Sequence, residues 1–262
     1  MRALRVTMKA AALVAGLFVA GSVPAVPAQA ADDVPHPPHL DISSRHLFGG
    51  FDRGEVQRGF LVYNQVCANC HSLRLLSYRN LREIGLTDEQ VRTVAAAVQV
   101  TDGPNDEGAM FERPGRPSDR FRSPFANENA ARAANNGAAP TDLSLMAKAR
   151  EGGADYIHAL LTGYADPPAG MTLMPGMNYN RYFPGHQIAM APPLTGEGQV
   201  DYADGTPVTV EQMARDVSAF LHWAAEPELE KRKAMGVKVI IFLLILLGLA
   251  YAVKRRVWAD AH

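Results

Sequence analysis

Hydrophobic positions along this chain fall into short helical stretches, separated by long segments that lack a regular pattern. Between residues 53 and 66, Val56, Phe60 and Tyr63 recur at the spacing of one helix face. A second helix is predicted from residue 87 to about residue 98. There Thr87 and Gln90 stand three positions apart, which is the pattern of a capping box at a helix start.

Further helices are predicted toward the C-terminus. Residues 142–151 and 155–162 are expected to be two short helices divided by a pair of glycines, and residues 209–225 a longer one. Thr209 and Gln212 form a second capping-box pattern at the start of the longer helix, and Pro227 follows its end.

Two segments show little periodicity, residues 101–140 and residues 163–206. Both are rich in glycine, proline, asparagine and aspartate, which is typical of loops. A bound cofactor can order such a segment, so a loop covering a cofactor and a plain linker are both open here. The pattern as a whole predicts an all-α domain with long irregular loops.

Two apolar stretches are typical of export and membrane insertion. Residues 1–30 carry three basic side chains, an apolar run and the small-residue pattern Ala28-Gln29-Ala30, which predicts a cleaved signal peptide. Residues 239–253 form an unbroken apolar run, and residues 234–255 are therefore expected to be a transmembrane anchor in contact with membrane lipid. Basic residues flank both ends of this run, so the signal peptide decides the orientation.

The predicted organisation follows from these two signals. Residues 31–233 would be a periplasmic domain and residues 256–262 a cytoplasmic tail, in a single-pass protein of a bacterial inner membrane. The chain has 26 Lys and Arg against 27 Asp and Glu, a formal charge of -1. This balance gives no indication of nucleic-acid binding.

Residues 67–71, Cys-Ala-Asn-Cys-His, carry the clearest chemical signal. Two thiols at this spacing followed by an imidazole are the attachment pattern of a c-type haem: Cys67 and Cys70 would bind the porphyrin and His71 the iron. A thioredoxin-like pair would need a βαβ pattern, which is missing. A zinc site would need further ligands, and these are the only two cysteines in the chain. One covalently bound haem c is predicted.

A haem iron held by His71 can be left open on its other side, or closed by methionine, histidine or another group. Spacing alone does not choose among the candidates in the second irregular segment, which are Met171, Met174, Met177, His186 and Met190.

Four stretches resemble the cytochrome c1 family, the haem subunits of ubiquinol–cytochrome c reductase. They are residues 66–72 (VCANCHS), residues 130–144 with AARAANNGA and PTDLS, residues 182–193 (YFPGHQIAMAPP) and residues 223–228 (WAAEPE). The resemblance covers essentially the whole mature chain. It implies a c-type cytochrome fold.

The resemblance also implies roles for particular residues. The methionine before Ala-Pro-Pro is the distal ligand of the family, which selects Met190. Arg150 and Tyr156 match family residues that meet the haem propionates, and Pro140 opens the segment on the haem side. Some bacterial members carry a disulfide that braces the distal loop. This chain has no cysteine left to form one, so the brace of the Met190 loop is an open question.

The function implied by the resemblance is electron transfer within a respiratory chain, from a Rieske iron–sulfur protein to a soluble cytochrome c, beside cytochrome b. The chain would not be an enzyme by itself. An anchored cytochrome c that feeds an oxidase is the alternative, and a haem peroxidase would need an open distal site. Two groups of acidic residues resemble family segments that dock cytochrome c, although solvated loops would look the same. They are Asp102, Asp106, Glu107 and Glu112, and Glu197, Asp201 and Asp204.

Overall fold

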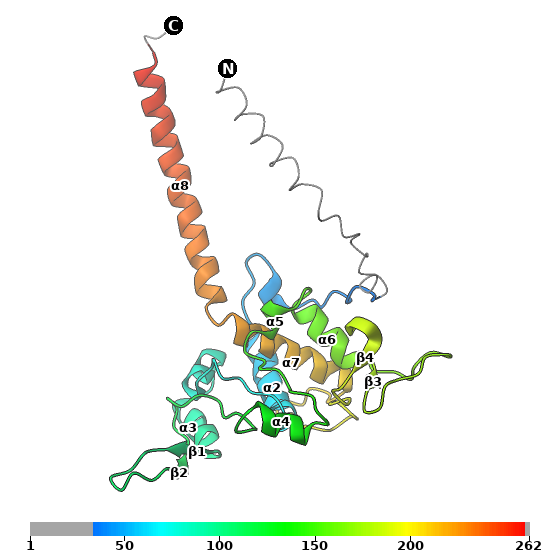
Figure 1. Ribbon diagram of the computed structural model, residues 1–262. Coiled ribbons are helices and arrows are strands. Elements are labelled where there is room, and N and C mark those ends of the chain that lie inside the picture. The colour runs from blue at the N-terminus through cyan, green and yellow to red at the C-terminus, as the bar shows by residue number, and fades with distance from the viewer. Residues whose placement is uncertain (1–33, 260–262) are drawn as a thin grey trace, which may run out of the picture. The chain divides into compact units, whose positions relative to one another are not determined.

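The computed structural model describes residues 34–259 (Figure 1). The predicted signal peptide and the last three residues of the predicted tail lie outside this range. The helices are α2 (Arg53–Gln65), α3 (Asp88–Ala96), α4 (Glu128–Ala134), α5 (Met146–Ala149), α6 (Ala154–Thr162), α7 (Val210–Ala225) and α8 (Leu229–Val257). Short 3-10 helices are η1 (Ser43–Arg45), η2 (Cys67–Asn69), η3 (Tyr78–Ile84) and η4 (Pro184–His186).

The core forms where α2 and α7 pack against each other, with α5 and α6 also against α7. The apolar positions that predicted α2 are all buried in this contact, as are Met213, Val217 and Phe220 of α7. Tyr63 of α2 lies with its ring centroid 5.6 Å from that of Phe220 of α7. At Gly59 the two helices come so close that a Cβ atom would lie 2.0 Å from the carbonyl oxygen of Asp216. Only glycine fits at this crossing.

A buried ion pair also joins α2 and α7. The guanidinium of Arg58 donates two hydrogen bonds of 3.0 Å to the carboxylate of Asp216, which is fully buried. A third bond of 2.7 Å reaches Asp204 in the loop before α7. The amide of Gln212 donates to Asp216 as well, at 3.0 Å. Thr209 caps α7 by accepting from the Gln212 backbone, but the expected reciprocal bond from the Thr209 backbone to the Gln212 side chain is absent, and that side chain donates to Asp216 instead.

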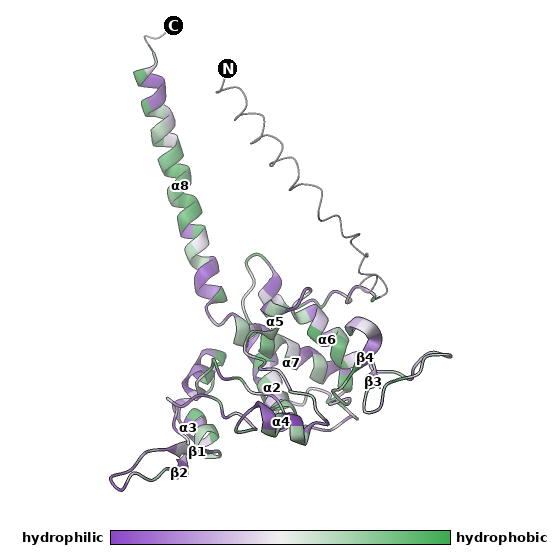
Figure 2. Ribbon diagram, in the orientation of Figure 1, coloured by the Kyte–Doolittle hydropathy of each residue, from purple (hydrophilic) through white to green (hydrophobic). Residues whose placement is uncertain are grey.

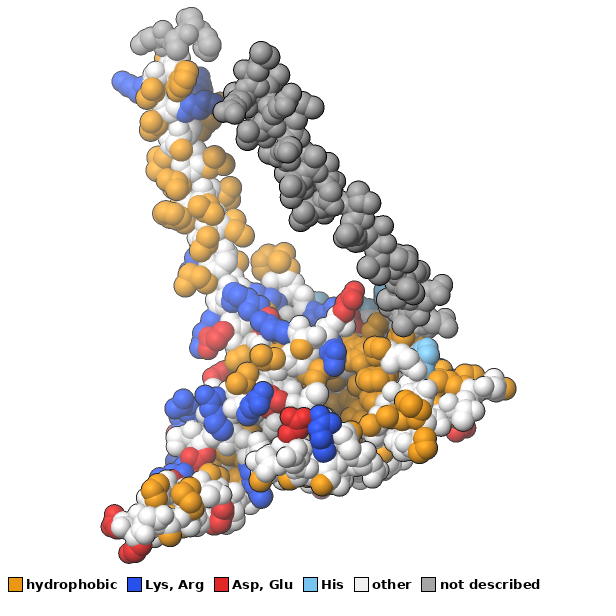
Figure 3. Space-filling model, in the orientation of Figure 1, with side chains coloured by type: hydrophobic (Ala, Val, Ile, Leu, Met, Phe, Trp, Pro, Cys, Tyr) orange, Lys and Arg blue, Asp and Glu red, His pale blue; other side chains and the backbone are white. Residues whose placement is uncertain are grey.

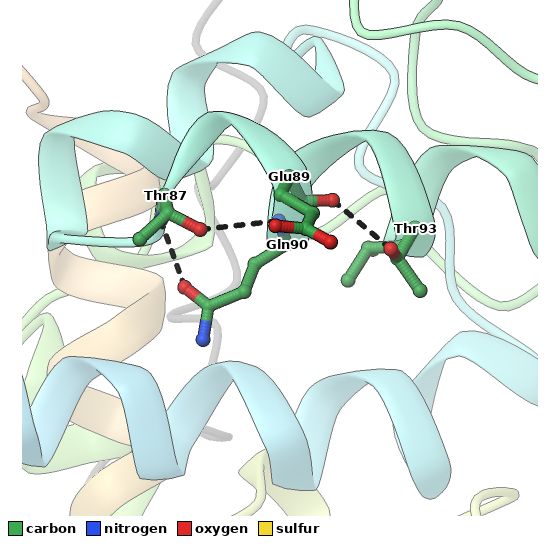
Figure 4. Close-up of a pocket in the computed structure, with 5 residues that line it drawn as sticks. Thr87, Glu89, Gln90 and Thr93 are labelled. Carbon is green, nitrogen blue, oxygen red and sulfur yellow. Dashed lines mark hydrogen bonds between the residues drawn. The ribbon is translucent and has the colours of Figure 1, made fainter.

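The capping box predicted for α3 is confirmed (Figure 4). The backbone of Thr87 donates to the Gln90 side chain at 2.8 Å, and the Thr87 hydroxyl accepts from the Gln90 backbone at 3.2 Å. A shallow pocket is lined here by residues of α3. The Thr93 hydroxyl that faces it already donates to the carbonyl of Glu89, so these polar groups are engaged within the helix.

The expectation of an all-α domain is met only in part. Strands β1 (Gln99–Asp102) and β2 (Phe111–Pro114) form an antiparallel hairpin inside the first irregular segment. Strands β3 (Asn178–Tyr179) and β4 (Gln187–Ile188) form a second, smaller ladder. The first hairpin has a physical cause that periodicity could not reveal, because its strands are four residues long and mostly exposed. Arg113 of β2 pairs with Asp102 of β1 and with Asp119, which fixes the register.

The first of the two helices expected between residues 142 and 162 is much shorter than predicted. Only α5 forms there, because the Asp142 carboxylate accepts from the backbone amides of Arg74 and Ser144 instead of starting a helix. The second, α6, has the expected extent.

Helix α8 contains the predicted membrane anchor. Among the described residues it is the one helix that is long and apolar enough to cross a membrane, and Figure 2 shows its apolar middle between polar ends. It begins at Leu229, inside the stretch that the sequence assigned to the periplasmic domain. Leu229 is buried in the domain core, so the first turn of α8 belongs to the domain.

Candidate functional site

The Cys-Ala-Asn-Cys-His motif forms a tight turn at the end of α2. The backbone amides of Cys70 and His71 both donate to the carbonyl of Cys67, at 3.0 and 2.8 Å. Both cysteines are free thiols, Cys67 half-buried and Cys70 exposed. Burial raises the pKa of the Cys67 thiol to about 12. The turn therefore presents two unpaired thiols and an imidazole side by side.

The imidazole of His71 is oriented by the backbone of a distant segment. Its Nδ1 lies 2.7 Å from the carbonyl oxygen of Thr141. Because a carbonyl can only accept, Nδ1 carries the proton and Nε2 keeps its lone pair. Burial lowers the pKa of His71, which favours this neutral form. Metal-binding histidines are commonly fixed in this way, with the second nitrogen bonded to a carbonyl.

Asp142 holds the Thr141 carbonyl in place. Its carboxylate accepts from the Ser72 hydroxyl at 2.7 Å, from the Arg74 backbone at 2.9 Å and from the Ser144 backbone at 3.0 Å. These bonds tie residues 141–144 to the chain just after the motif, and they lower the pKa of Asp142 against the effect of its burial. Pro140, which the resemblance places in the haem pocket, immediately precedes residues 141–144 and is half-buried. The roles of the Thr141 carbonyl and of Asp142 were missed from sequence, since no side-chain pattern reports a backbone acceptor.

Met190 is half-buried in the loop after β4, and its backbone is held at two points. Its carbonyl accepts from the Tyr164 hydroxyl at 3.1 Å and from the Asn178 amide at 3.4 Å. The fully buried Asn180 adds support, because its amide donates to the end of α6 at Leu160 and its backbone donates to His186. These hydrogen bonds and the β3–β4 ladder brace a loop that has no disulfide.

The other candidates for a distal ligand differ in their surroundings. His186 directs Nδ1 at the carbonyl of Asn180, 3.2 Å away. Met174 is exposed over 56% of its surface, whereas Met171 and Met177 are half-buried. Figure 3 shows a hollowed apolar area on the visible face of the domain, over α6.

Arg150 and Tyr156 lie close enough to interact. Burial raises the pKa of the Tyr156 phenol, and the nearby charge of Arg150 opposes that rise. Arg150 is exposed at the end of α5, and within residues 34–259 it forms no ion pair. Between them Gly152 and Gly153 both adopt positive φ angles, 81° and 55°, which allow the sharp turn into α6. A guanidinium and a phenol placed this way can bind a carboxylate from a ligand.

The residues of the motif fit a covalently attached haem. Two free thiols can form thioether bonds, and an imidazole with Nδ1 engaged offers Nε2 to iron. A zinc cluster does not fit, since no group of three or more His, Cys, Asp or Glu side chains gathers as a metal site anywhere in the described part of the chain.

Comparison with known proteins gives the family. A sequence model described as the Cytochrome C1 family matches residues 42–261. The chain belongs to the cytochrome c1 family. A relative named cytochrome c1 from Rhodospirillum rubrum is 45% identical, over 84% of this chain and 86% of that protein. A mitochondrial cytochrome c1 heme protein from Arabidopsis thaliana is 52% identical, over 81% of this chain and 69% of the relative.

A third relative is a longer protein. The protein named cytochrome b/c1 from Bradyrhizobium diazoefficiens is 48% identical over 96% of this chain, but this chain spans only 39% of its length. Together these matches confirm the family resemblance drawn from the four sequence stretches.

Proposed function

We propose that this chain is the membrane-anchored c-type haem subunit of a bacterial quinol–cytochrome c reductase in a respiratory chain. It passes electrons from a Rieske iron–sulfur protein to a soluble cytochrome c and catalyses no bond chemistry by itself. One observation carries the proposal. In a chain of the cytochrome c1 family, two free thiols adjoin an imidazole whose Nδ1 is bound to the Thr141 carbonyl.

Cys67 and Cys70 would hold one haem c through thioether bonds, and Nε2 of His71 and the sulfur of Met190 would bind its iron. The bound group would supply one-electron exchange between the ferric and ferrous states of iron. A thioether ligand raises the potential, which suits an acceptor that follows a Rieske centre. The Thr141 carbonyl, whose segment is held by Asp142, keeps the His71 ring in one tautomer. The hydrogen bonds from Tyr164 and Asn178 restrain the Met190 backbone.

Arg150, Tyr156 and Pro140 would complete the haem pocket. A guanidinium that forms no ion pair within residues 34–259 and a phenol beside it are suited to the propionate carboxylates. Pro140 fixes the backbone just before Thr141, the residue that orients His71.

Helix α8 would anchor the subunit in the inner membrane, with the haem domain in the periplasm and the C-terminus in the cytoplasm. Its apolar side chains are exposed on every face, which suits lipid or another membrane protein. Cytochrome b is the expected neighbour within the membrane. The name of the Bradyrhizobium relative, cytochrome b/c1, supports this pairing.

The docking surface for soluble cytochrome c would lie at the β1–β2 hairpin. The Thr206 backbone and the Arg58 guanidinium lower the pKa of Asp204 to about 2, so its charge is already engaged within the domain. Asp106 and Glu107, in contrast, are exposed between the two strands and form no ion pair within the described residues. They would supply charge that can attract a basic partner.

The axial ligand provides the test of this proposal. Met190→Leu should abolish the weak sulfur-to-iron absorption band and lower the midpoint potential, while the haem stays attached. The matched controls change the other methionines of the same segment in the same way: Met171→Leu, Met174→Leu and Met177→Leu. If one of these controls loses the band and Met190→Leu keeps it, the ligand assignment is wrong.

A further inference from the structure

Two large apolar side chains stand at the tip of a short loop between η1 and α2. Leu47 is 78% exposed and Phe48 is 85% exposed. Among the large hydrophobic side chains of the described residues, none is more exposed, and even Val257 at the end of α8 reaches only 71%. Single exposed hydrophobic residues are common on protein surfaces. An adjacent pair this exposed needs a partner to remove it from water.

The loop is held rigidly by the first turn of α8. The ammonium of Lys233 donates to three carbonyl oxygens of the loop: that of Ser44 at 2.8 Å, that of Gly49 at 2.9 Å, and that of His46. All three donor positions of the ammonium are therefore used on one loop. At Gly49 a Cβ atom would lie 1.8 Å from the carbonyl oxygen of Ser43, so the closed form of the loop requires glycine.

A second side chain of α8 holds the chain where the loop ends. The carboxylate of Glu230 accepts from the Phe51 backbone at 2.7 Å and from the guanidinium of Arg53 at 2.6 Å. The loop and the beginning of α2 are thus bound to the same helical turn. Because both ends are fixed, the Leu47–Phe48 tip keeps one position relative to α8.

That position is beside the part of α8 that leaves the domain (Figure 1). From Lys233 to Val239, where the unbroken apolar run begins, the helix rises by about 9 Å. The polar layer on each side of a bilayer core is about 5–8 Å thick. A side chain that stands next to Lys233 and extends along α8 therefore reaches the level of the lipid headgroups.

We propose that Leu47 and Phe48 insert into the bilayer interface beside α8 and form a second membrane contact of the haem domain. The occupant of this surface is lipid, because the loop is bound to the first turn of the membrane helix and its tip carries no charge. The inference rests on the proposed role of α8 as a membrane anchor. Two contact points, joined by Lys233 and Glu230, would restrict the tilt of the domain over the membrane.

The test uses the full-length haem protein in nanodiscs of phosphatidylcholine and phosphatidylglycerol. Phe48→Cys is labelled with a thiol-specific spin label, and its collisions with oxygen, which partitions into lipid, are compared with those of a polar nickel chelate. Wild-type protein provides the background, since both native thiols should be occupied by haem. Met110→Cys, 60% exposed on the β1–β2 hairpin, is the water-facing control, and Val239→Cys is the lipid-facing one.

The expected ratio of oxygen to nickel accessibility at Phe48 is several-fold above that at Met110 and approaches that at Val239. Leu47→Cys should agree. If Phe48 matches Met110 while Val239 reports lipid, the second contact is refuted and the anchor stands. If Val239 itself reports water, the anchor proposal fails. Low accessibility to both reagents at Phe48 would show a protein partner there and would also overturn the lipid assignment.

Discussion

The buried ion pair between α2 and α7 offers a quantitative test of what holds the haem domain together. The Arg58 side chain is 19% exposed, and Asp216, which accepts two of its hydrogen bonds, is 0% exposed. Arg58→Met would remove the guanidinium and leave the Asp216 carboxylate in the core with only the bond from Gln212.

Leaving a buried charge without its partner costs about 3–5 kcal/mol of unfolding free energy. In a domain of this size, 1 kcal/mol corresponds to about 2–4 °C in melting temperature. Arg58→Met should therefore lower the melting temperature by about 6–20 °C. Arg82→Met is a matched control, since Arg82 pairs with Asp88 at the surface where both partners are more than half exposed. Such a pair contributes at most about 1 kcal/mol.

A double-mutant cycle separates the unpaired charge from lost packing. Asp216→Asn keeps the shape of the side chain and removes its charge, so it should partly restore the stability of the Arg58→Met protein while it destabilises the wild type. Thermal unfolding of the full-length haem protein in non-ionic detergent, followed by far-ultraviolet circular dichroism, measures both effects. If Asp216→Asn lowers the melting temperature equally in both backgrounds, the two side chains are not coupled and the reasoning is wrong.

Two further predictions concern helix packing and docking. Gly59→Ala should destabilise the domain strongly, because its Cβ atom would lie 2.0 Å from a backbone oxygen of α7. Gly54→Ala on the same helix should be tolerated, because the nearest atom to its Cβ would lie 3.3 Å away. If both substitutions lower the melting temperature equally, the close crossing at Gly59 is contradicted. Asp106→Asn or Glu107→Gln should slow reduction of a basic cytochrome c at low ionic strength and approach wild type as salt rises, because screening shortens the reach of charge to about 8 Å at physiological salt. Glu228→Gln, which removes one charge at the start of α8, should leave the reduction rate unchanged. If stopped-flow kinetics give the wild-type rate for all three variants, the docking surface lies elsewhere.

Much of the helical framework could be predicted from the sequence, because burial imposes a period on the chain. Val56, Phe60 and Tyr63 predicted α2, and the structure buries all three against α7. The cap of α3 was equally readable, since Thr87 and Gln90 interact within one turn. Local patterns report local structure, and these elements depend mainly on it.

Elements that depend on distant partners were not readable in this way. The β1–β2 hairpin is fixed by pairs such as Asp102 with Arg113, which lie too far apart along the chain for a local pattern to link them. The Gln212 side chain could bind either the Thr209 backbone or Asp216, and in the structure it donates to the buried Asp216. The early start of α8 follows from the burial of Leu229, which a scan for apolar runs overlooks among charged neighbours.

The candidate site likewise has a part that local sequence predicts and a part that depends on distant contacts. The motif at residues 67–71 indicated a covalent haem from chemistry alone, because its three functional side chains are contiguous. Met190 could be separated from its neighbours only by resemblance to a family, since spacing left several methionines open. The orientation of His71 by the Thr141 carbonyl is visible only in the three-dimensional structure, because the identity of a side chain does not report a backbone acceptor.

Everything proposed for this chain depends on one covalent haem at Cys67 and Cys70. The most direct measurement is the intact mass of the purified protein after extraction with acid–acetone, which removes haem that is not covalently bound. We expect a mass equal to the processed chain plus one haem, with the colour retained on the polypeptide. Haem that extracts completely, or a chain whose two cysteines form a disulfide, would contradict it.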